Sequence, residues 1–321
     1  MHILITGAAG FIGQLVAQKL LNDAQHTVHL TDVINPPIPP NVHYPHHATT
    51  SQADLHSPTA ATSIITAHLD AAYLLHGIMS TGSESNFALG LSINLSATRT
   101  LLEAIRTTCR PSIRVIYASS QAVYGRPFPA LVAPIDETWR PTPESSYGTA
   151  KLICEALIND YTRRGFLDGF SLRFPTVAVR PGAPTAAASS FLSAMIREPL
   201  NGQACTIPLQ DRAFTSWVCS PRVLAANLLH ALTVPSSSLP AHDRTVNMPG
   251  TAVTIQEMMD ALEKVSDRDR LGFLKEVTDP VQERILRSWP TRFDNSRAYS
   301  LGFQPDLGFE QAVVDYKASL G

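Results

Sequence analysis

The sequence predicts an α/β protein built on a doubly wound parallel sheet, because short apolar segments alternate with helical stretches along the chain. The first apolar segment, His2–Thr6, is followed by a glycine-rich turn and then by a helical run to about Asn22. Later apolar segments have the length and composition of buried strands. They are 27–31, 69–75, 113–118 and 170–174.

The glycine-rich turn has the spacing G-x-x-G-x-x-G, formed by Gly7, Gly10 and Gly13, with Phe11 and Ile12 between the last two glycines. In this arrangement the first glycine permits the tight strand-to-helix turn and the second lets a pyrophosphate approach the backbone. The third lets helix and strand pack closely. The N–H groups and dipole at the start of the next helix favour bound phosphate. The turn therefore predicts a Rossmann-type sheet that binds a dinucleotide through these five residues.

Asp32 ends the second expected strand, 25 positions after Gly7. An acidic residue at this point accepts hydrogen bonds from the ribose hydroxyls of the cofactor and repels a 2′-phosphate. No lysine or arginine occurs between Lys19 and Arg99 to bind such a phosphate. The sequence therefore favours NAD over NADP.

Residues near the ends of the other strands complete the expected NAD site, because open parallel sheets bind ligands at the carboxyl ends of their strands. Asn94 lies on the polar side of a helix expected from 86 to 108, where its amide can bridge a strand and the site. His76 is expected to pack near the dinucleotide rather than to act in catalysis. The remaining cofactor residues are Asp54, Leu55, Leu75, Gly77, Ala118, Ser119, Pro175, Thr176 and Val177, the last three at the nicotinamide.

Tyr147 and Lys151 form the pattern with the clearest chemistry, since residues four apart on a helix lie on one face, one turn from each other. A free phenol has a pKa of about 10, too high for a base near neutral pH. A neighbouring ammonium favours the phenolate and lowers that pKa. A hydroxyl of the Ser119–Ser120 pair can orient the substrate oxygen. This predicts proton transfer beside a hydride acceptor, with Tyr147 and Lys151 also contacting NAD.

The sequence indicates the substrate-binding residues less clearly than the cofactor-binding and catalytic residues. Ser80 is expected to face the substrate, and a carboxylate substrate needs an arginine, whose planar fork suits bidentate pairing. Arg180 is the preferred candidate over Arg197 and Arg212, although any of the three can instead form a structural ion pair. Ser189 can bind substrate hydroxyls or cap the following helix.

No metal site is expected. The segment 35–49 is rich in proline and histidine but contains no cysteine or carboxylate. Zinc sites in proteins combine histidine with such ligands. The segment is therefore interpreted as an irregular surface connection.

Three segments, 6–13, 117–125 and 147–151, resemble the extended short-chain dehydrogenase/reductases, the NAD-dependent epimerase/dehydratase family. The resemblance implies that Ser120 is the catalytic serine and that Tyr147 and Lys151 complete the catalytic set. It also implies an NAD-binding region over 1–174 and a mainly substrate-binding region over 175–321 that returns to the sheet. Members of this family dimerise through two long helices, so a homodimer is expected.

Further segments, among them 159–166 and 175–182, resemble family members that oxidise the C2 hydroxyl of a four-carbon sugar acid with NAD. The expected function is hydride transfer between NAD and a secondary alcohol or ketone, with a D-erythronate-like acid as substrate. Ser80, Ser120, Tyr147, Arg180 and Ser189 are expected to surround that substrate. The alternatives are a nucleotide-sugar epimerase with tightly bound NAD, a reductase of another ketone or aldehyde, and a non-catalytic NAD sensor.

Bulk properties exclude several other classes of partner. The formal charge of −2 over 321 residues gives no electrostatic basis for binding nucleic acid or an anionic membrane. No apolar run reaches the roughly 18 residues that a membrane span needs, and the chain begins with a strand rather than a basic leader. Four cysteines far apart in sequence predict reduced thiols. A small-molecule enzyme of the cytoplasm is therefore expected.

Overall fold

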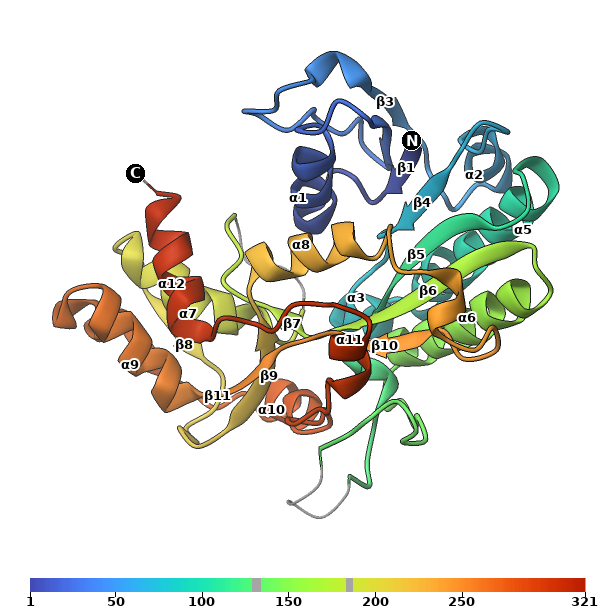
Figure 1. Cartoon of the computed structure of the whole chain (residues 1–321). Coiled ribbons are helices and arrows are strands. Elements are labelled where there is room, and N and C mark those ends of the chain that lie inside the picture. The colour runs from blue at the N-terminus through green and yellow to red at the C-terminus, as the bar shows by residue number, and fades with distance from the viewer. Residues whose placement is uncertain (129–133, 183–186, 321) are drawn as a thin grey trace.

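The computed structural model describes residues 1–128, 134–182 and 187–320. Its centre is a seven-stranded sheet of order β10-β6-β5-β4-β1-β2-β3, in which all neighbouring strands are parallel (Figure 1). The strands are β1 (His2–Thr6), β2 (Thr27–Asp32), β3 (Ala48–Gln52), β4 (Ala71–Leu74), β5 (Ile113–Ser120), β6 (Leu167–Phe174) and β10 (Thr245–Asn247). The predicted doubly wound parallel sheet is confirmed.

β1 is the strand at which the order of the sheet reverses, because it pairs with β2 on one side and with β4 on the other. Its side chains alternate between the two faces of the sheet. Ile3 and Ile5 belong to one apolar core, and Leu4 belongs to the core of the opposite face. A reversal of this kind opens a crevice at the carboxyl ends of the flanking strands.

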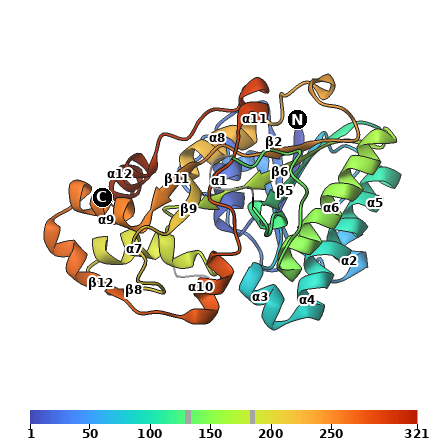
Figure 2. The same ribbon diagram turned by 90° about the horizontal axis from the view of Figure 1, so that it is seen from below.

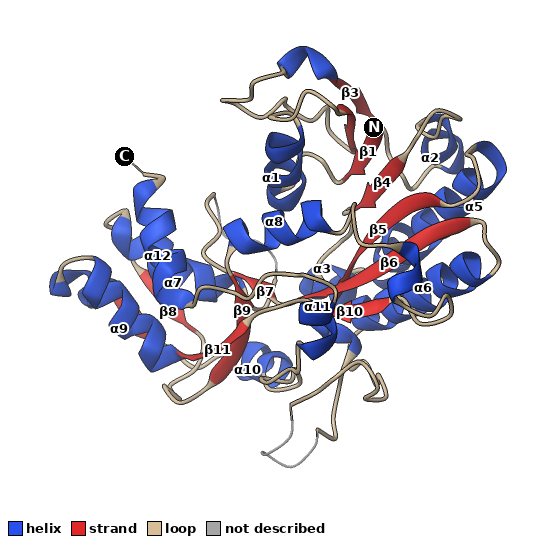
Figure 3. Cartoon of the chain, viewed as in Figure 1, coloured by secondary structure: helices blue, strands red, loops and turns tan. Residues whose placement is uncertain are grey.

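Helices cover both faces of the large sheet (Figure 3). One face packs against α1 (Phe11–Leu20), α8 (Pro221–His230) and α11 (Ser296–Ser300). The other face packs against α2 (Pro58–Ser63), α5 (Thr98–Thr108) and α6 (Ser146–Arg163), of which α5 and α6 lie side by side in Figure 2.

The helix expected from 86 to 108 is present in three parts. It begins with α4 (Phe87–Leu91), continues as a π-helical segment (Ser92–Ala97) and ends as α5. A short helix, α3 (Ser80–Ser85), precedes it. Asn94 therefore lies in the π-helical segment, where the wider turn changes the direction of its side chain relative to an α-helix.

The C-terminal part of the chain forms a lobe with its own apolar core. A three-stranded sheet contains β7 (Thr176–Val177), β9 (Thr215–Cys219) and β11 (Thr251–Thr254), and β8 (Cys205–Ile207) pairs with β12 (Leu274–Glu276). Its helices are α7 (Ser190–Leu200), α9 (Ile255–Val265), α10 (Pro280–Leu286) and α12 (Phe309–Ala318). Figure 1 shows the C-terminus in this lobe and the N-terminus in the large sheet. Short 3₁₀ turns occupy 45–47, 121–123, 236–238 and 268–273.

Two strands of the large sheet come from regions that carry no apolar strand signal. β3, which begins inside the segment interpreted as an irregular connection, has the polar sequence Ala-Thr-Thr-Ser-Gln and no buried residue. It is a strand because its backbone pairs with β2 from Val28 to Asp32 at the sheet edge. β10 is the opposite edge, and it returns from the C-terminal part to pair with β6.

Candidate active site

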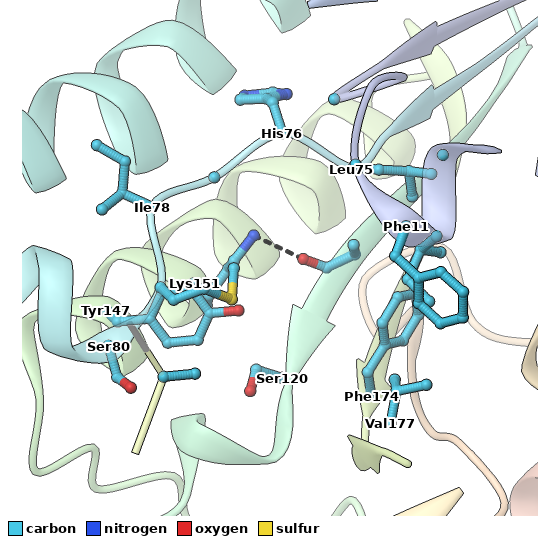
Figure 4. A pocket seen from close by; sticks show the side chains of 18 of the residues that line it. Phe11, Leu75, His76, Ile78, Ser80, Ser120, Tyr147, Lys151, Phe174 and Val177 are labelled. Atoms are coloured by element: carbon cyan, nitrogen blue, oxygen red, sulfur yellow. Dashed lines mark hydrogen bonds between the residues drawn. The ribbon is translucent and has the colours of Figure 1, made fainter. Parts of the chain in front are cut away.

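A cavity of about 740 Å³ lies between the carboxyl ends of the large sheet and the C-terminal lobe (Figure 4). Its wall contains the end of β2, the end of β5 and the turn after β6. All of the residues predicted for the site except Asn94 line it. They are Gly7, Gly10, Phe11, Ile12, Gly13, Asp32, Asp54, Leu55, Leu75, Gly77, Ser80, Ala118, Ser119, Ser120, Tyr147, Lys151, Pro175, Thr176, Val177, Arg180 and Ser189.

The glycine-rich turn fits a bound pyrophosphate. A Cβ on Gly13 would lie 2.4 Å from the carbonyl oxygen of Gly7, and a Cβ on Gly7 would lie 2.8 Å from the backbone nitrogen of His76. Gly7 also has a φ of +69°, which side chains other than glycine rarely adopt. Gly10 differs, because its Cβ would meet only the Gly7 oxygen, at 3.2 Å. The first and last glycines are thus required by packing, whereas Gly10 leaves the backbone open toward the cavity.

Asp32 links the glycine turn to the end of β2. Its carboxylate accepts hydrogen bonds from the backbone N–H of Ala9, at 2.9 Å, and of Val33, at 2.7 Å. The carboxylate also lines the cavity. Within the described ranges, no lysine or arginine of the cavity wall comes from β2 or β3. This end of the cavity suits ribose hydroxyls and disfavours an additional phosphate.

Helix α6 carries Tyr147 and Lys151 because Ser145 fixes where it begins. The Ser145 side chain accepts a hydrogen bond from the N–H of Gly148, at 3.1 Å, and so caps the helix. In Figure 4 the phenol of Tyr147 and the hydroxyl of Ser120 point toward the same space. Lys151 is buried and donates a hydrogen bond of 2.7 Å to the carbonyl oxygen of Ala118.

The pKa values of this pair differ from the expectation. Burial raises the pKa of Tyr147 to about 12, with a hydrogen bond to Ser120 acting in the opposite direction. Burial lowers the pKa of Lys151 to about 8. The lowering of the Tyr147 pKa by Lys151 stays a prediction. Its ammonium lies 5.5 Å from the centre of the tyrosine ring and bonds to Ala118 rather than approaching the phenol oxygen.

His76 connects two elements beneath the cavity. Its Nδ1 lies 2.8 Å from Oγ1 of Thr6, and its Nε2 lies 3.1 Å from Oγ1 of Thr98. Burial, together with the charge of Lys151, lowers the pKa of His76 to about 3. The imidazole is therefore neutral near pH 7 and joins β1 to α5, in line with a packing role rather than a catalytic one.

Asn94 lies behind the cavity wall instead of in it. Its Oδ1 accepts a hydrogen bond from the N–H of Ile78, at 2.8 Å. Its Nδ2 donates to the carbonyl oxygen of Ile78, at 3.0 Å, and to Oγ of Ser83, at 3.1 Å. The amide thus fixes the loop that follows β4, and a Cβ on Gly77 would lie 3.0 Å from Asn94 Oδ1. The grouping of Asn94 with the cofactor-lining residues is corrected to a role in positioning that loop.

The hydroxyl of Ser119, predicted among the cofactor contacts, has a protein partner. It donates to Oε1 of Glu155, at 2.5 Å, and that carboxylate forms a buried ion pair with Arg173, at 2.6 Å. Ser119 therefore lines the cavity with its hydroxyl turned to the protein. Sequence reasoning missed this pair, and the available signal was a charged residue, Arg173, inside the expected buried strand 170–174.

The three candidate arginines have different surroundings. Arg212 pairs with Glu276 on the surface, at 2.6 Å, outside the cavity wall. Arg197 lines the cavity but pairs with Glu198, at 2.6 Å. Arg180 also lines the cavity, and across residues 1–128, 134–182 and 187–320 its guanidinium has no hydrogen bond or ion pair. Burial and the charge of Arg197 lower its pKa. Within the described residues, the Arg180 guanidinium is thus a charge without a partner, which an anionic ligand could neutralise.

Two further residues complete the lobe side of the cavity. Ser189 is the first residue before α7 but makes no capping hydrogen bond with its side chain, so the alternative of a helix cap is not supported. Trp289, just after α10, lines the cavity as well. No sequence pattern indicates Trp289, because its position depends on how the lobe folds over the sheet.

Together, the fold and the cavity define an NAD-dependent enzyme of the doubly wound α/β class. The chain belongs to the NAD dependent epimerase/dehydratase family, which it matches over residues 3–231. The predicted family and the predicted cofactor, NAD, are confirmed.

The chain is 39% identical over 320 residues to the D-erythronate dehydrogenase of Haemophilus influenzae, covering 98% of both proteins. It is 38% identical over 337 residues to the D-erythronate dehydrogenase of Cupriavidus necator, covering 100% of this chain and 99% of the relative. Among solved structures, it resembles one described as a nucleoside-diphosphate-sugar epimerase from Agrobacterium tumefaciens. That likeness has a TM-score of 0.88 and 35% identity, and it covers 98% of this chain and 92% of the other.

Across the portion of the chain that the structure describes, no helix combines the length and apolar character needed to span a bilayer. In the same portion, no group of three or more histidine, cysteine, aspartate or glutamate side chains could hold a metal ion.

Proposed function

We propose that this protein is an NAD-dependent dehydrogenase that oxidises the C2 hydroxyl of a D-erythronate-like sugar acid to a 2-keto acid. The observation that carries the proposal is the guanidinium of Arg180, which lines the cavity and has no partner in the described residues. Two relatives 38–39% identical over nearly the full chain are D-erythronate dehydrogenases. A carboxylate substrate would supply the charge that Arg180 lacks.

The cofactor end of the cavity is assigned to NAD, which supplies the hydride acceptor when bound. The backbone around Gly10 would hold the pyrophosphate at the start of α1, and Asp32 would accept bonds from the adenosine ribose. Asp54 and Leu55 would contact the adenine, whereas Leu75, Gly77 and Ala118 line the path across the sheet edge. Pro175, Thr176 and Val177 would contact the nicotinamide, and Lys151 its ribose.

Proton transfer is assigned to the residues at the ends of β5 and α6. Tyr147 would take the proton of the C2 hydroxyl as a phenolate, the form that the Lys151 ammonium one helical turn away would favour, and Ser120 would orient the hydroxyl oxygen. The C2 hydrogen leaves as hydride, so one alcohol is oxidised to one ketone while NAD is reduced and one proton is released. Proton transfer by a positioned side chain typically contributes about 10²- to 10⁴-fold to the rate.

The lobe end of the cavity is assigned to the rest of the substrate. Arg180 would pair with the carboxylate through two parallel N–H donors, a geometry that fixes orientation as well as position. Ser80 and Ser189, which both line the cavity, would contact the remaining hydroxyls of the acid.

An epimerase is the second candidate, because the structural relative described as a nucleoside-diphosphate-sugar epimerase is 35% identical. Ser120, Tyr147 and Lys151 can serve either dehydrogenation or epimerisation. The two differ in the fate of the hydride: an epimerase returns it to the substrate, so NADH does not accumulate.

Net NADH formation separates these functions. The purified protein is mixed with NAD or NADP and with D-erythronate, L-threonate, the neutral polyol erythritol or a nucleotide sugar, and NADH absorbance is followed. The proposal expects NADH with D-erythronate and NAD, a much weaker signal with erythritol, and none with the nucleotide sugar. If the protein only oxidises NADH in the presence of ketones or aldehydes, it is a reductase and the sugar-acid assignment is wrong. Tightly bound NAD with isomerised nucleotide sugar would replace it with an epimerase.

We also propose that residues 1–174 mainly bind NAD and that 175–321 mainly bind the substrate. β10 of the second region is a strand of the large sheet and α8 packs on one face of it, so the two regions are expected to unfold together. One cooperative transition in urea, seen alike by fluorescence and circular dichroism, is the expected result. Two separated transitions would contradict it.

A homodimer is proposed from two packed helices, α4 and α6, that both leave large apolar side chains in solvent. Phe87 on α4 is 61% exposed and Ile153 on α6 is 39% exposed. Large exposed apolar side chains on packed helices favour a protein interface. Light scattering should give twice the chain mass for the wild type and a monomer for Phe87→Asp. Val281→Asp, an exposed apolar position on α10, is the matched control and should stay dimeric.

The cytoplasm is proposed as the compartment, because Cys109, Cys154, Cys205 and Cys219 are all free and the last three are buried. Free thiols persist in a reducing environment. Cell fractionation with an antibody against the protein tests this, and recovery in an oxidising compartment would contradict it.

A further inference from the structure

The segment that carries Ser120 is anchored at both ends by a single buried ion pair. Glu155 on α6 and Arg173 on β6 are 2% and 5% exposed, so both charges are removed from water. Their contact is bidentate: Nε of Arg173 lies 2.9 Å from Oε1 of Glu155 and its Nη2 lies 2.6 Å from Oε2. A pair of this kind has a fixed geometry because the planar guanidinium matches the carboxylate.

The carboxylate anchors the beginning of the Ser120 segment. Ser119 donates its hydroxyl hydrogen bond to Oε1 of Glu155, at 2.5 Å. Glu155 follows Tyr147 and Lys151 at intervals of four residues, so all three lie on one face of α6. The backbone next to Ser120 is therefore tied to the same helix that carries the tyrosine.

The guanidinium anchors the end of the segment. Nη1 of Arg173 donates to the hydroxyl of Tyr124, and that hydroxyl donates in turn to Oδ1 of Asn247, at 2.9 Å. Between the two anchors the chain makes a single 3₁₀ turn, in which the hydroxyl of Ser120 accepts a hydrogen bond from the N–H of Ala122, at 3.1 Å.

We propose that the Glu155–Arg173 pair positions Ser120 against Tyr147, and that Ser119 and Tyr124 are the contacts through which it acts. The proposal rests on the proposed dehydrogenase function and extends it to four residues outside the catalytic set. The strands β5 and β6 and the helix α6 meet at this pair. A shift of either anchor would move the Ser120 hydroxyl relative to the phenol, and a misplacement of about 1 Å can cost about 100-fold in rate.

A second ion-pair cluster provides a control. Asp168 pairs with Arg114 and Arg244, and the hydroxyl of Ser236, an exposed residue, donates to its Oδ2, at 2.5 Å. Ser236 therefore makes the same type of serine-to-carboxylate bond as Ser119, but none of these four residues lines the cavity. Loss of the exposed Ser236 bond should cost less stability than loss of the buried Ser119 bond, and only the Ser119 bond should affect Ser120.

The first test compares Ser119→Ala, Tyr124→Phe and Ser236→Ala in the NADH assay. Ser119→Ala and Tyr124→Phe are each expected to lower kcat about 10-fold, with the Kd for NAD changed less than about twofold. Ser236→Ala should keep the wild-type kcat. Equal kcat for Ser119→Ala, Ser236→Ala and wild type would overturn the proposal.

The second test repeats the two anchor variants in a Ser120→Ala background. If the anchors act through Ser120, their effect on kcat should disappear once the Ser120 hydroxyl is absent, so the double variants should match Ser120→Ala alone. A further 10-fold loss in the double variants would show that the anchors act on something other than Ser120, and would contradict the proposal.

Hydrogen–deuterium exchange tests the same idea without turnover. The N–H groups of Ala122 and Tyr124, which bond to Ser120 and Gln121, report the order of the turn. Ser119→Ala and Tyr124→Phe should accelerate exchange over 120–124 at least about threefold relative to Ser236→Ala. Unchanged exchange would contradict the proposal even if the substrate assignment is correct. An inactive wild type with accelerated exchange in the variants would overturn only the dehydrogenase assignment.

Discussion

The two ends of the cavity differ in whether their polar side chains already have partners in the protein. At the edge of the large sheet, polar side chains are already engaged: Asp32 bonds to two backbone N–H groups, His76 to two threonines and Lys151 to a carbonyl oxygen. At the lobe end, the Arg180 guanidinium has no partner in the described residues. A side chain with partners fixes geometry, whereas a partly buried charge without one favours a ligand of opposite charge. Substitutions at the sheet edge should therefore alter rate, cofactor choice or stability, and substitutions in the lobe should alter substrate affinity.

The largest effect is expected for Tyr147→Phe. It removes the proton acceptor and leaves the glycine turn and Asp32 intact, so kcat should fall at least about 10²- to 10⁴-fold while the Kd for NAD is unchanged. Rapid-mixing kinetics and fluorescence titration with NAD measure the two quantities. Tyr161→Phe, on the same helix but bonded to Glu103 near the surface, is the control and should keep full activity. Turnover of Tyr147→Phe within a factor of ten of wild type would reject the assignment.

Arg180→Met tests the lobe end. Hydrogen bonds to charged groups contribute about 1.5–3 kcal/mol, so the KM for the sugar acid should rise about 10- to 150-fold. Turnover of a neutral alcohol should change little, because no carboxylate is involved. Arg180→Lys should recover only part of the loss, since an ammonium lacks the planar fork. Arg212→Met removes a surface pair with Glu276 and should behave as wild type. Equal effects on acid and neutral substrates would contradict carboxylate binding.

Asp32→Asn tests whether the negative charge of Asp32 is what makes the enzyme prefer NAD to NADP. The amide oxygen can still accept the hydrogen bond from Ala9, but the negative charge that repels a 2′-phosphate is gone. Two like charges about 4 Å apart cost at least about 1 kcal/mol in water. The ratio of kcat/KM for NAD over NADP should therefore fall at least about fivefold. An unchanged ratio would show that shape, rather than charge, excludes NADP.

The smallest effect concerns His76 and pH. Burial lowers its pKa from 6.5 to about 3 in the folded protein, so below pH 6.5 the unfolded chain binds a proton that the folded protein does not. Folding stability from this residue is therefore lost as pH falls from 6.5 toward 3. Between pH 7 and pH 6 the loss should be about 0.7 kcal/mol. Urea unfolding of the wild type and of His76→Gln measures it, and an equal pH dependence in both would contradict a neutral buried imidazole.

Local patterns in the sequence determined the cofactor end and the chemistry. The spacing of Gly7, Gly10 and Gly13 is dictated by a turn of a few residues, and Tyr147 and Lys151 share a helix face because of the helical repeat alone. Such patterns depend on neighbours in the chain, so the sequence contains all the information needed. The sheet, the family and NAD were predictable for this reason.

Only the tertiary structure decided which polar groups are paired. The sequence favours Arg180 over Arg197 and Arg212 but does not show their partners. Arg197 and Arg212 pair with Glu198 and Glu276, whereas the Arg180 guanidinium has no partner in the described residues. Ser119, expected at the cofactor, bonds to Glu155, and Lys151 bonds to the carbonyl oxygen of Ala118. β3 is a strand only because β2 offers a free edge. Each outcome depends on burial and on partners distant in the chain, since the energy of a charge or an unpaired N–H is set by its surroundings in space.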